Sequence, residues 1–223
     1  MPDGQYSFYL HSDDRTDIAA MATISTISQP LRGEFIRTAA TAGAVVYQVD
    51  ARLPALIPVF FAGQLSAVRL CAVMALVSGA WSSLTGLPDE PENGEAALPV
   101  SPETEYQRRR YTLTLQNGRS GERVESVLTE ASSRLRSDLL RNLIITGLAL
   151  HTTAPELPRL LASMPVPPTS VSELQALVQQ MAGTADVNRA AAAVPDTPTA
   201  SAAPVSGSDT REIKKNMRRA FGD

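Results

Sequence analysis

Two short segments of this sequence carry polar side chains at every second position, and these residues have the most evident chemistry. Amide, hydroxyl, imidazole and guanidinium groups donate or accept hydrogen bonds, so a row of them suits the recognition of a hydrogen-bonding surface. The polar positions are Gln5, Ser7, Tyr9 and His11 in the first segment and Arg110, Thr112, Thr114 and Gln116 in the second.

The rest of the sequence does not indicate catalysis. Its two histidines, His11 and His151, lie far apart without the spacing of metal ligands. There is no glycine-rich phosphate loop, no G-x-S-x-G elbow and no H-E-x-x-H motif. The single cysteine, Cys71, lies in an apolar run and excludes both a disulfide framework and a cysteine-based zinc site. We therefore predict a protein that is not an enzyme and that needs neither a cofactor nor a metal.

The alternation of polar and apolar residues predicts that both segments are β-strands. The positions between the polar ones are Tyr6, Phe8 and Leu10 in the first segment and Tyr111, Leu113 and Leu115 in the second. A period of two is typical of a strand with one buried face. Because a single short strand is not stable alone, we expect Tyr6–His11 and Arg110–Gln116 to pair as one antiparallel ribbon, within one chain rather than between two.

The two segments belong to a tandem duplication. The stretch "RGEFIRTAATAGAVV" at Arg32–Val46 has the same layout as "RSDLLRNLIITGLAL" at Arg136–Leu150, 104 residues later. Arginines and a glycine recur at matching positions, among them Gly43 and Gly147, which are expected near the C-terminal end of a helix. The strand segments keep this correspondence with a change of one residue in the offset.

Each predicted strand is followed by two helices. Apolar residues at helical spacing form one stripe on each. In the first helix, the stripe is Ile18, Met21 and Ala22 in the first repeat and Val124, Val127, Leu128 and Ala131 in the second. In the second helix, it is Phe35, Ile36 and Ala39 in the first repeat and Leu139, Leu140, Leu143 and Ile144 in the second. Ser28 and Ser132 stand at matching positions before the second helix, where we expect them to act as N-caps.

Further apolar residues predict capping helices. The stretch 53–83 is almost wholly apolar, and its counterpart Ser170–Gly183 is amphipathic. A membrane span is the competing interpretation of 53–83, but Pro54, Pro58 and Arg69 interrupt the run, so a buried capping helix is favoured. The fold class we predict is mainly α with one short antiparallel β-ribbon, built as a tandem pseudo-dimer with extra capping helices.

Composition divides the chain further. We predict repeats at residues 1–83 and 108–183, joined by an acidic linker at 84–107 that has six acidic and no basic residues. Residues 184–208 are rich in Ala, Pro, Ser and Thr and are predicted to be disordered. Residues 209–223 are predicted to form an amphipathic helix whose apolar stripe suits a partner protein. That stripe is Ile213, Met217, Ala220 and Phe221.

Charge and targeting signals bear on the partner and the compartment. The net charge is −3, but residues 108–183 hold nine basic and six acidic residues, so the second repeat is net positive. Partner arguments rest on such local patches rather than on the whole-chain sum. The N-terminus lacks a secretion signal, and a cytoplasmic protein is expected.

The strand–helix–helix unit with arginines in its second helix resembles the ribbon-helix-helix family. That resemblance implies a ribbon that enters the major groove of DNA, a groove wide enough for two strands. The eight polar strand residues would then read base edges, with Arg108 and Arg109 flanking the ribbon near phosphates. Amides around Ser28–Leu31 and Ser132–Leu135, together with Arg134, would hold further phosphates. The alternative is that any half-exposed strand has a polar outer face.

The whole layout is similar to the ParR/StbB-type plasmid segregation adaptors. This likeness implies that the folded part binds plasmid centromere repeats beside neighbouring copies of itself. It also implies that the C-terminal helix docks on an actin-like ParM filament, and that the protein is associated with plasmid DNA. The duplication departs from that family, whose usual member carries one unit and dimerises.

Other interpretations remain open. A relaxosome accessory protein of the TraY type also has tandem ribbon-helix-helix units, and an autorepressor would use the same DNA-binding surface. A helical interaction scaffold, or an antitoxin-like module, would make no DNA contact at all. Salt-dependent binding to duplex DNA separates these classes, because neutralising phosphates makes affinity fall steeply with salt.

Overall fold

The structure, a computed structural model, describes residues 4–79 and 107–192, without the side chains of 184–192. Nearly all of the predicted acidic linker, residues 193–208 and the predicted partner-binding residues Ile213, Met217, Ala220 and Phe221 lie outside the described residues. The described residues up to 188 belong to one compact unit.

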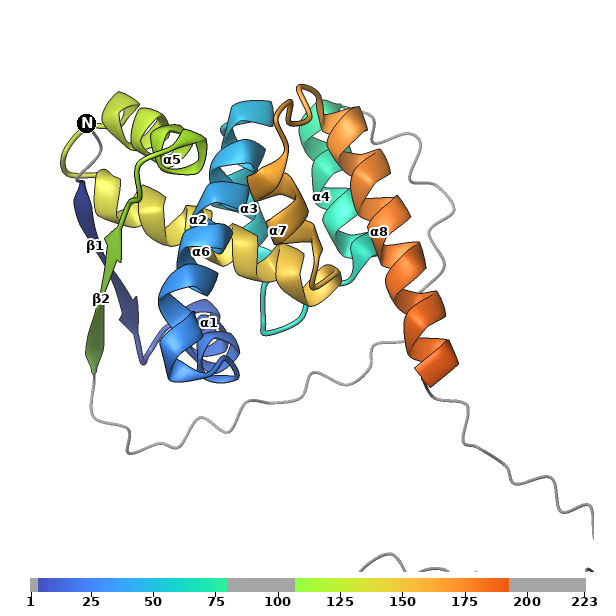
Figure 1. The fold of residues 1–223 in the computed structure, drawn as a ribbon, viewed down its shortest axis with the longest axis horizontal. Helices are drawn as coiled ribbons and strands as arrows, with labels where there is room; N and C mark the ends of the chain where they lie inside the picture. The colour runs from blue at the N-terminus through green and yellow to red at the C-terminus, as the bar shows by residue number, and fades with distance from the viewer. Residues whose placement is uncertain (1–3, 80–106, 193–223) are drawn as a thin grey trace, which may run out of the picture. The chain divides into compact units, whose positions relative to one another are not determined.

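The order of elements repeats within the chain, and Figure 1 shows the ribbon on one side of the helices. The fold class predicted from the sequence, mainly α with one antiparallel ribbon in a tandem arrangement, is confirmed. The first repeat consists of β1 (Gln5–His11), α1 (Arg15–Ser25), a 3-10 turn (Gln29–Leu31), α2 (Arg32–Val49), α3 (Leu53–Phe60) and α4 (Ala67–Ser78). The second consists of β2 (Arg108–Thr114), α5 (Arg119–Glu130), α6 (Arg136–Thr153), α7 (Leu157–Ser163) and α8 (Val171–Ala192).

The two strands pair antiparallel within one chain, as predicted. Phe8 and Leu113 are buried on the inner face, and the ring of Phe8 stacks on that of Tyr111 with 5.2 Å between centroids. β2 begins and ends two residues earlier than the sequence predicts. Hydrogen bonds continue the pairing past both ends of the ribbon, from the amide of Ser12 to the carbonyl of Gln107 at 3.0 Å and from the amide of Leu115 to the carbonyl of Gly4 at 3.2 Å.

The second helices of the two repeats, α2 and α6, cross at the centre of the core. At the crossing, a Cβ atom on Gly43 would lie 2.0 Å from the carbonyl oxygen of Leu143, and one on Gly147 would lie 2.2 Å from that of Ala39. These distances leave no room for a side chain at either position. Both glycines were predicted near the C-terminal ends of their helices; each lies instead in the helix interior, because α2 continues to Val49 and α6 to Thr153.

The buried face of the first helix is predicted correctly in only one repeat. In α5, Val124, Val127 and Leu128 are buried as expected. In α1, Ala22 is exposed, and the buried residues are Asp17, Ala19, Ala20 and Ile24. The prediction was wrong because it excluded a charged residue from the core, whereas the carboxylate of Asp17 is buried with a partner.

The predicted serine caps are also corrected. Neither α2 nor α6 has a side-chain cap, because Ser28 and Ser132 lie four residues before each helix and begin a turn instead. In both turns, the serine carbonyl accepts a hydrogen bond of 3.0 Å from the amide three residues later. The first arginine of each helix then braces the turn: Arg32 Nε donates to the carbonyl of Ile27 at 2.8 Å, and Arg136 Nε donates to that of Ala131 at 3.2 Å.

Each repeat has two capping helices, whereas a single one was predicted for the second repeat. α3 ends at Phe60, and α4 begins at Ala67 with Ser66 as its N-cap. α8 continues to Ala192, whereas the sequence predicts that the helix ends at Gly183 and that disorder begins at residue 184. Its alanine-rich end favours a helix. Within 4–79 and 107–192, no helix is both long and apolar enough to cross a membrane.

Candidate nucleic-acid interface

The outer face of the ribbon brings together most of the polar residues that the sequence predicts as a site. The antiparallel register places them opposite one another in four cross-strand pairs, all with the same parity and therefore on one face. The inner positions, by contrast, include the fully buried Phe8 and Leu10. The outward pairs are Gln5 with Thr114, Ser7 with Thr112, Tyr9 with Arg110, and His11 with Arg108.

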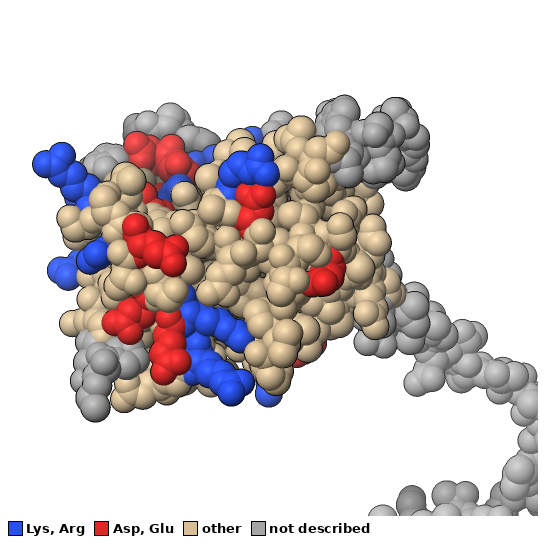
Figure 2. Space-filling model, turned by 90° about the horizontal axis from the view of Figure 1, so that it is seen from above, with Lys and Arg blue, Asp and Glu red and all other residues tan. Residues whose placement is uncertain are grey.

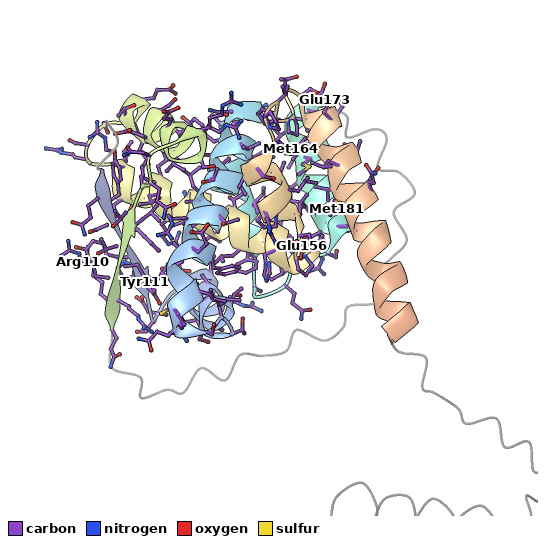
Figure 3. The ribbon with its side chains drawn as sticks, in the orientation of Figure 1. Arg110, Tyr111, Glu156, Met164, Glu173 and Met181 are labelled. Carbon is purple, nitrogen blue, oxygen red and sulfur yellow. The ribbon has the colours of Figure 1, made fainter. Side chains whose placement is uncertain are left out.

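Two arginines of this face are held by side chains of β1. The guanidinium of Arg110 donates to the hydroxyl of Ser7 from Nη2 at 2.9 Å and from Nε at 3.2 Å. The guanidinium carbon of Arg108 lies 3.5 Å from the ring centroid of Tyr9, which is a cation–π contact. Figure 3 shows Arg110 projecting away from the helices and its neighbour Tyr111 projecting toward them.

Three predicted site residues lie elsewhere than expected. Arg108 and Arg109 do not flank the ribbon but lie within β2, which begins at Arg108. Arg109 has the parity of the inner face, yet its side chain is exposed and its guanidinium carbon lies 5.2 Å from the ring centroid of Tyr111. Gln116 lies beyond the end of β2 and is exposed, because β1 has no residue left to pair with it.

Both second helices pack against the ribbon, α2 against β2 and α6 against β1. Burial raises the pKa of Tyr111 on the inner face of β2, and the charges of Arg109 and Arg32 act in the opposite direction. Arg32, the first residue of α2, is therefore close enough to β2 to act on the ring. Leu31 and its counterpart Leu135 are exposed at 60% and 59% immediately before the two helices. Ser28, Ser132 and Arg134 are also exposed.

Comparison with known proteins gives a family. The description "plasmid stability protein" belongs to a family that matches the chain twice, at residues 4–74 and again at 109–178. Each match begins at or beside a strand and ends in the fourth helix of its repeat, and together they cover more than half of the chain. This chain belongs to the plasmid stability protein family. No curated protein and no solved structure matches it.

The family unit is thus one strand followed by four helices, and this plasmid stability protein contains the unit twice. Family membership gives it a role in plasmid maintenance. Among the described residues, no group of three or more His, Cys, Asp or Glu side chains could hold a metal ion. The chemistry available on the ribbon is hydrogen bonding and charge.

In this plasmid stability protein, positive charge lies along the ribbon. β2 begins with three consecutive arginines, whereas β1 contains no lysine or arginine. Figure 2 shows arginine side chains projecting at the left edge, the side on which Figure 1 places the ribbon, and carboxylates to the right of them. A positive face on a protein of net negative charge suits an anionic partner.

Sequence reasoning missed the residues that anchor the end of the ribbon. Asp17 of α1 is fully buried and accepts hydrogen bonds from the backbone amide of His11 at 2.9 Å and from Arg141 Nε at 2.6 Å. Arg141 belongs to the other repeat and also contacts Asp14 at 3.2 Å. Burial raises the pKa of Asp17, while the hydrogen bonds from Arg141 and His11 act in the opposite direction. The pair ties β1, α1 and α6 together.

The corresponding position in the second repeat holds glycine. Gly121 lies where a Cβ atom would be 2.1 Å from the carbonyl oxygen of Gln116, so the backbone that follows β2 leaves no place for a carboxylate. Arg37, the counterpart of Arg141, instead pairs with Glu34 on the surface of its own helix. The arginine at this matched position therefore forms a surface ion pair in the first repeat and a buried one in the second.

Proposed function

We propose that this protein binds plasmid centromere repeats in a sequence-specific manner through the outer face of its β-ribbon, as a component of plasmid partition. The observation that carries the proposal is the set of four outward cross-strand pairs, which presents amide, hydroxyl, imidazole and guanidinium groups on one exposed face. Family membership supplies the plasmid context.

The ribbon suits the major groove for physical reasons. A two-stranded ribbon fits the width of that groove, and base edges there carry distinct patterns of donors and acceptors. Arginine pairs with guanine and glutamine with adenine through two hydrogen bonds, and threonine contacts several bases. Arg110 is held by Ser7, so its guanidinium is oriented before it meets DNA, which reduces the entropy lost on binding.

Phosphate contacts would position the ribbon. α2 and α6 begin without side-chain caps. The amide of Arg32 donates to the carbonyl of Gln29, so the amides that follow it in the first turn would be the ones to bind an oxyanion. The exposed Arg109 and Arg134 add charge near the same surface. Contacts of this kind fix the orientation of a protein on the duplex and carry no sequence information themselves.

The C-terminal helix at residues 209–223 would carry the second activity, docking on an actin-like ParM filament. Its apolar residues recur at helical spacing, which is the pattern of a helix that binds in a groove. Neighbouring copies of the protein, bound to adjacent centromere repeats of the DNA, would present several such helices to one filament end. This increases avidity without new contacts.

Binding measurements test the proposal on DNA that flanks the gene. Arg110→Ala and Thr114→Ala should each reduce discrimination between cognate and unrelated duplexes by up to about 1–3 kcal/mol, because each would remove a base contact. Arg109→Ala is the matched control on the same strand. It should weaken binding to all sequences alike and reduce the dependence of affinity on salt.

The outcomes also separate the alternatives. If the strand variants bind the cognate duplex as the wild type does, the ribbon is not the reader. Binding confined to origin DNA, with bending, would favour a TraY-like accessory protein, and binding confined to its own promoter would favour an autorepressor. If the protein binds no duplex in a salt-dependent manner, the interpretation as a helical interaction scaffold remains.

A further inference from the structure

The ribbon has an internal twofold relation whose axis can be located from the pairing. The segments "YSFYL" at Tyr6–Leu10 and "YTLTL" at Tyr111–Leu115 correspond at an offset of 105 residues, the same offset that separates the starts of the two family matches, residues 4 and 109. Ser7 and Thr112 correspond at this offset, and they pair directly with each other. The axis therefore passes through the Ser7–Thr112 pair.

On either side of this axis, equivalent positions hold different residues. Arg110 of β2 corresponds to Gln5 of β1, and Thr114 of β2 corresponds to Tyr9 of β1. The register joins them into two pairs, Tyr9 with Arg110 on one side and Gln5 with Thr114 on the other. The two halves of the outer face thus have the same backbone geometry and different chemistry.

Positive charge is confined to one half. Arg110 lies on the same side of the axis as Arg108, which contacts the ring of Tyr9, and both lie toward the His11 end of the ribbon. The other half ends at the neutral pair Gln5 and Thr114. A homodimer of single units would carry identical halves, whereas a fused chain allows them to differ.

We propose that the protein recognises a non-palindromic DNA site and binds it in one orientation. The half-site that faces Tyr9 and Arg110 contains a guanine, and the equivalent position of the half-site that faces Gln5 and Thr114 contains an adenine. Guanine presents two major-groove acceptors to a guanidinium, whereas adenine presents an acceptor and a donor, which match a side-chain amide. This inference rests on the proposed function of the ribbon as the DNA reader.

Selection of binding sites from random duplexes by the full chain tests the proposal. The selected consensus should lack twofold symmetry, with guanine and adenine at symmetry-related positions. Two palindromic derivatives, one with guanine in both half-sites and one with adenine in both, should each bind about tenfold more weakly or worse than the selected site, because one bidentate contact is lost.

A double substitution makes the two halves alike. Gln5→Arg with Thr114→Tyr repeats the chemistry of the Tyr9–Arg110 half, at positions where Gln5 and Thr114 are exposed, so the fold should be retained. This variant should prefer the palindrome with guanine in both half-sites. Val59→Arg with Val166→Tyr is the matched control, since it adds the same two side chains at exposed positions outside the ribbon and should leave the asymmetric preference unchanged.

The outcomes distinguish this inference from the proposed function. If the wild-type chain selects a palindrome, or if the double variant keeps the asymmetric preference, the inference is overturned while the ribbon remains a DNA reader. If the chain shows no sequence preference on any duplex, the proposed function fails, and the inference fails with it.

Discussion

At the scale of single residues, the two repeats use one arginine in two ways. Arg141 reaches from α6 to the buried carboxylate of Asp17, whereas its counterpart Arg37 pairs with Glu34, whose side chain is 63% exposed. Water screens the exposed pair, which contributes little to stability. The buried carboxylate would be costly without its partners, so the Asp17–Arg141 contact is needed to keep the end of the ribbon on the core.

We expect Asp17→Ala to lower the free energy of unfolding by about 1–3 kcal/mol, because the amide of His11 and the guanidinium of Arg141 lose their acceptor. Urea denaturation of the full chain measures this change. The matched control is Glu34→Ala, which removes the equivalent surface pair and should change the free energy of unfolding by less than about 0.5 kcal/mol. Equal losses in the two variants would show that the buried pair has no special role.

The residue scale also limits what the sequence can predict. The polar outer face of the ribbon was predicted from alternation alone, because a period of two needs no tertiary information. The burial of Asp17 could not be predicted from the sequence, since its partner Arg141 lies 124 residues later in the chain. The orientation of Arg110 by Ser7 depends in the same way on the register of strands from different repeats.

At the scale of elements, the crossing of α2 and α6 organises the core. The two glycines at the crossing are related by the duplication, and each faces the backbone of the opposite helix rather than its side chains. Close approach brings the apolar faces of both helices together, with Ile36, Leu140 and Ile144 buried as the sequence predicts. The matched glycines were visible in the sequence, but their function depends on an interhelical distance that one helix alone does not determine.

Gly43→Ala should destabilise the fold by about 1–3 kcal/mol or more, because the added Cβ atom would lie 2.0 Å from the carbonyl oxygen of Leu143 and force the helices apart. Thermal or urea unfolding checks this. Gly183→Ala in α8 is the control, since no atom lies within 4 Å of its Cβ position. There the alanine should stabilise the helix by about 0.5–1 kcal/mol. Similar effects at both sites would contradict the close-packed crossing.

At the scale of the whole molecule, duplication explains both what the sequence predicts well and what it predicts poorly. Two copies of one pattern made the order of elements and the pairing of the strands predictable, because each copy supports the interpretation of the other. The positions at which the two copies have diverged were harder to predict. Gly121 of α5 and the exposed Ala22 of α1 are local differences that a shared pattern conceals.

Divergence of the copies also matters for function, because a fused pair can place different groups at equivalent positions. In a homodimer, one substitution changes the side chains that face both half-sites of the DNA at once. In this chain, one strand supplies the arginines, and the other supplies the hydroxyl and the aromatic ring that hold them. A protein bound in one orientation would also project its C-terminal segment to one side of each DNA repeat.

That C-terminal segment gives the last prediction. Met217→Ala with Phe221→Ala should abolish binding to the filament and plasmid segregation while leaving DNA affinity unchanged. These side chains fall on the apolar stripe of the predicted helix, which is too short to be stable alone in water and should become ordered against a partner. Lys214→Ala with Arg218→Ala, on the opposite side, is the matched control and should retain most filament binding. Co-sedimentation with filaments and DNA-binding titrations measure the two activities separately. The adaptor proposal fails if the apolar double variant loses DNA binding and keeps its protein partner, because the tail would then serve the duplex rather than the filament.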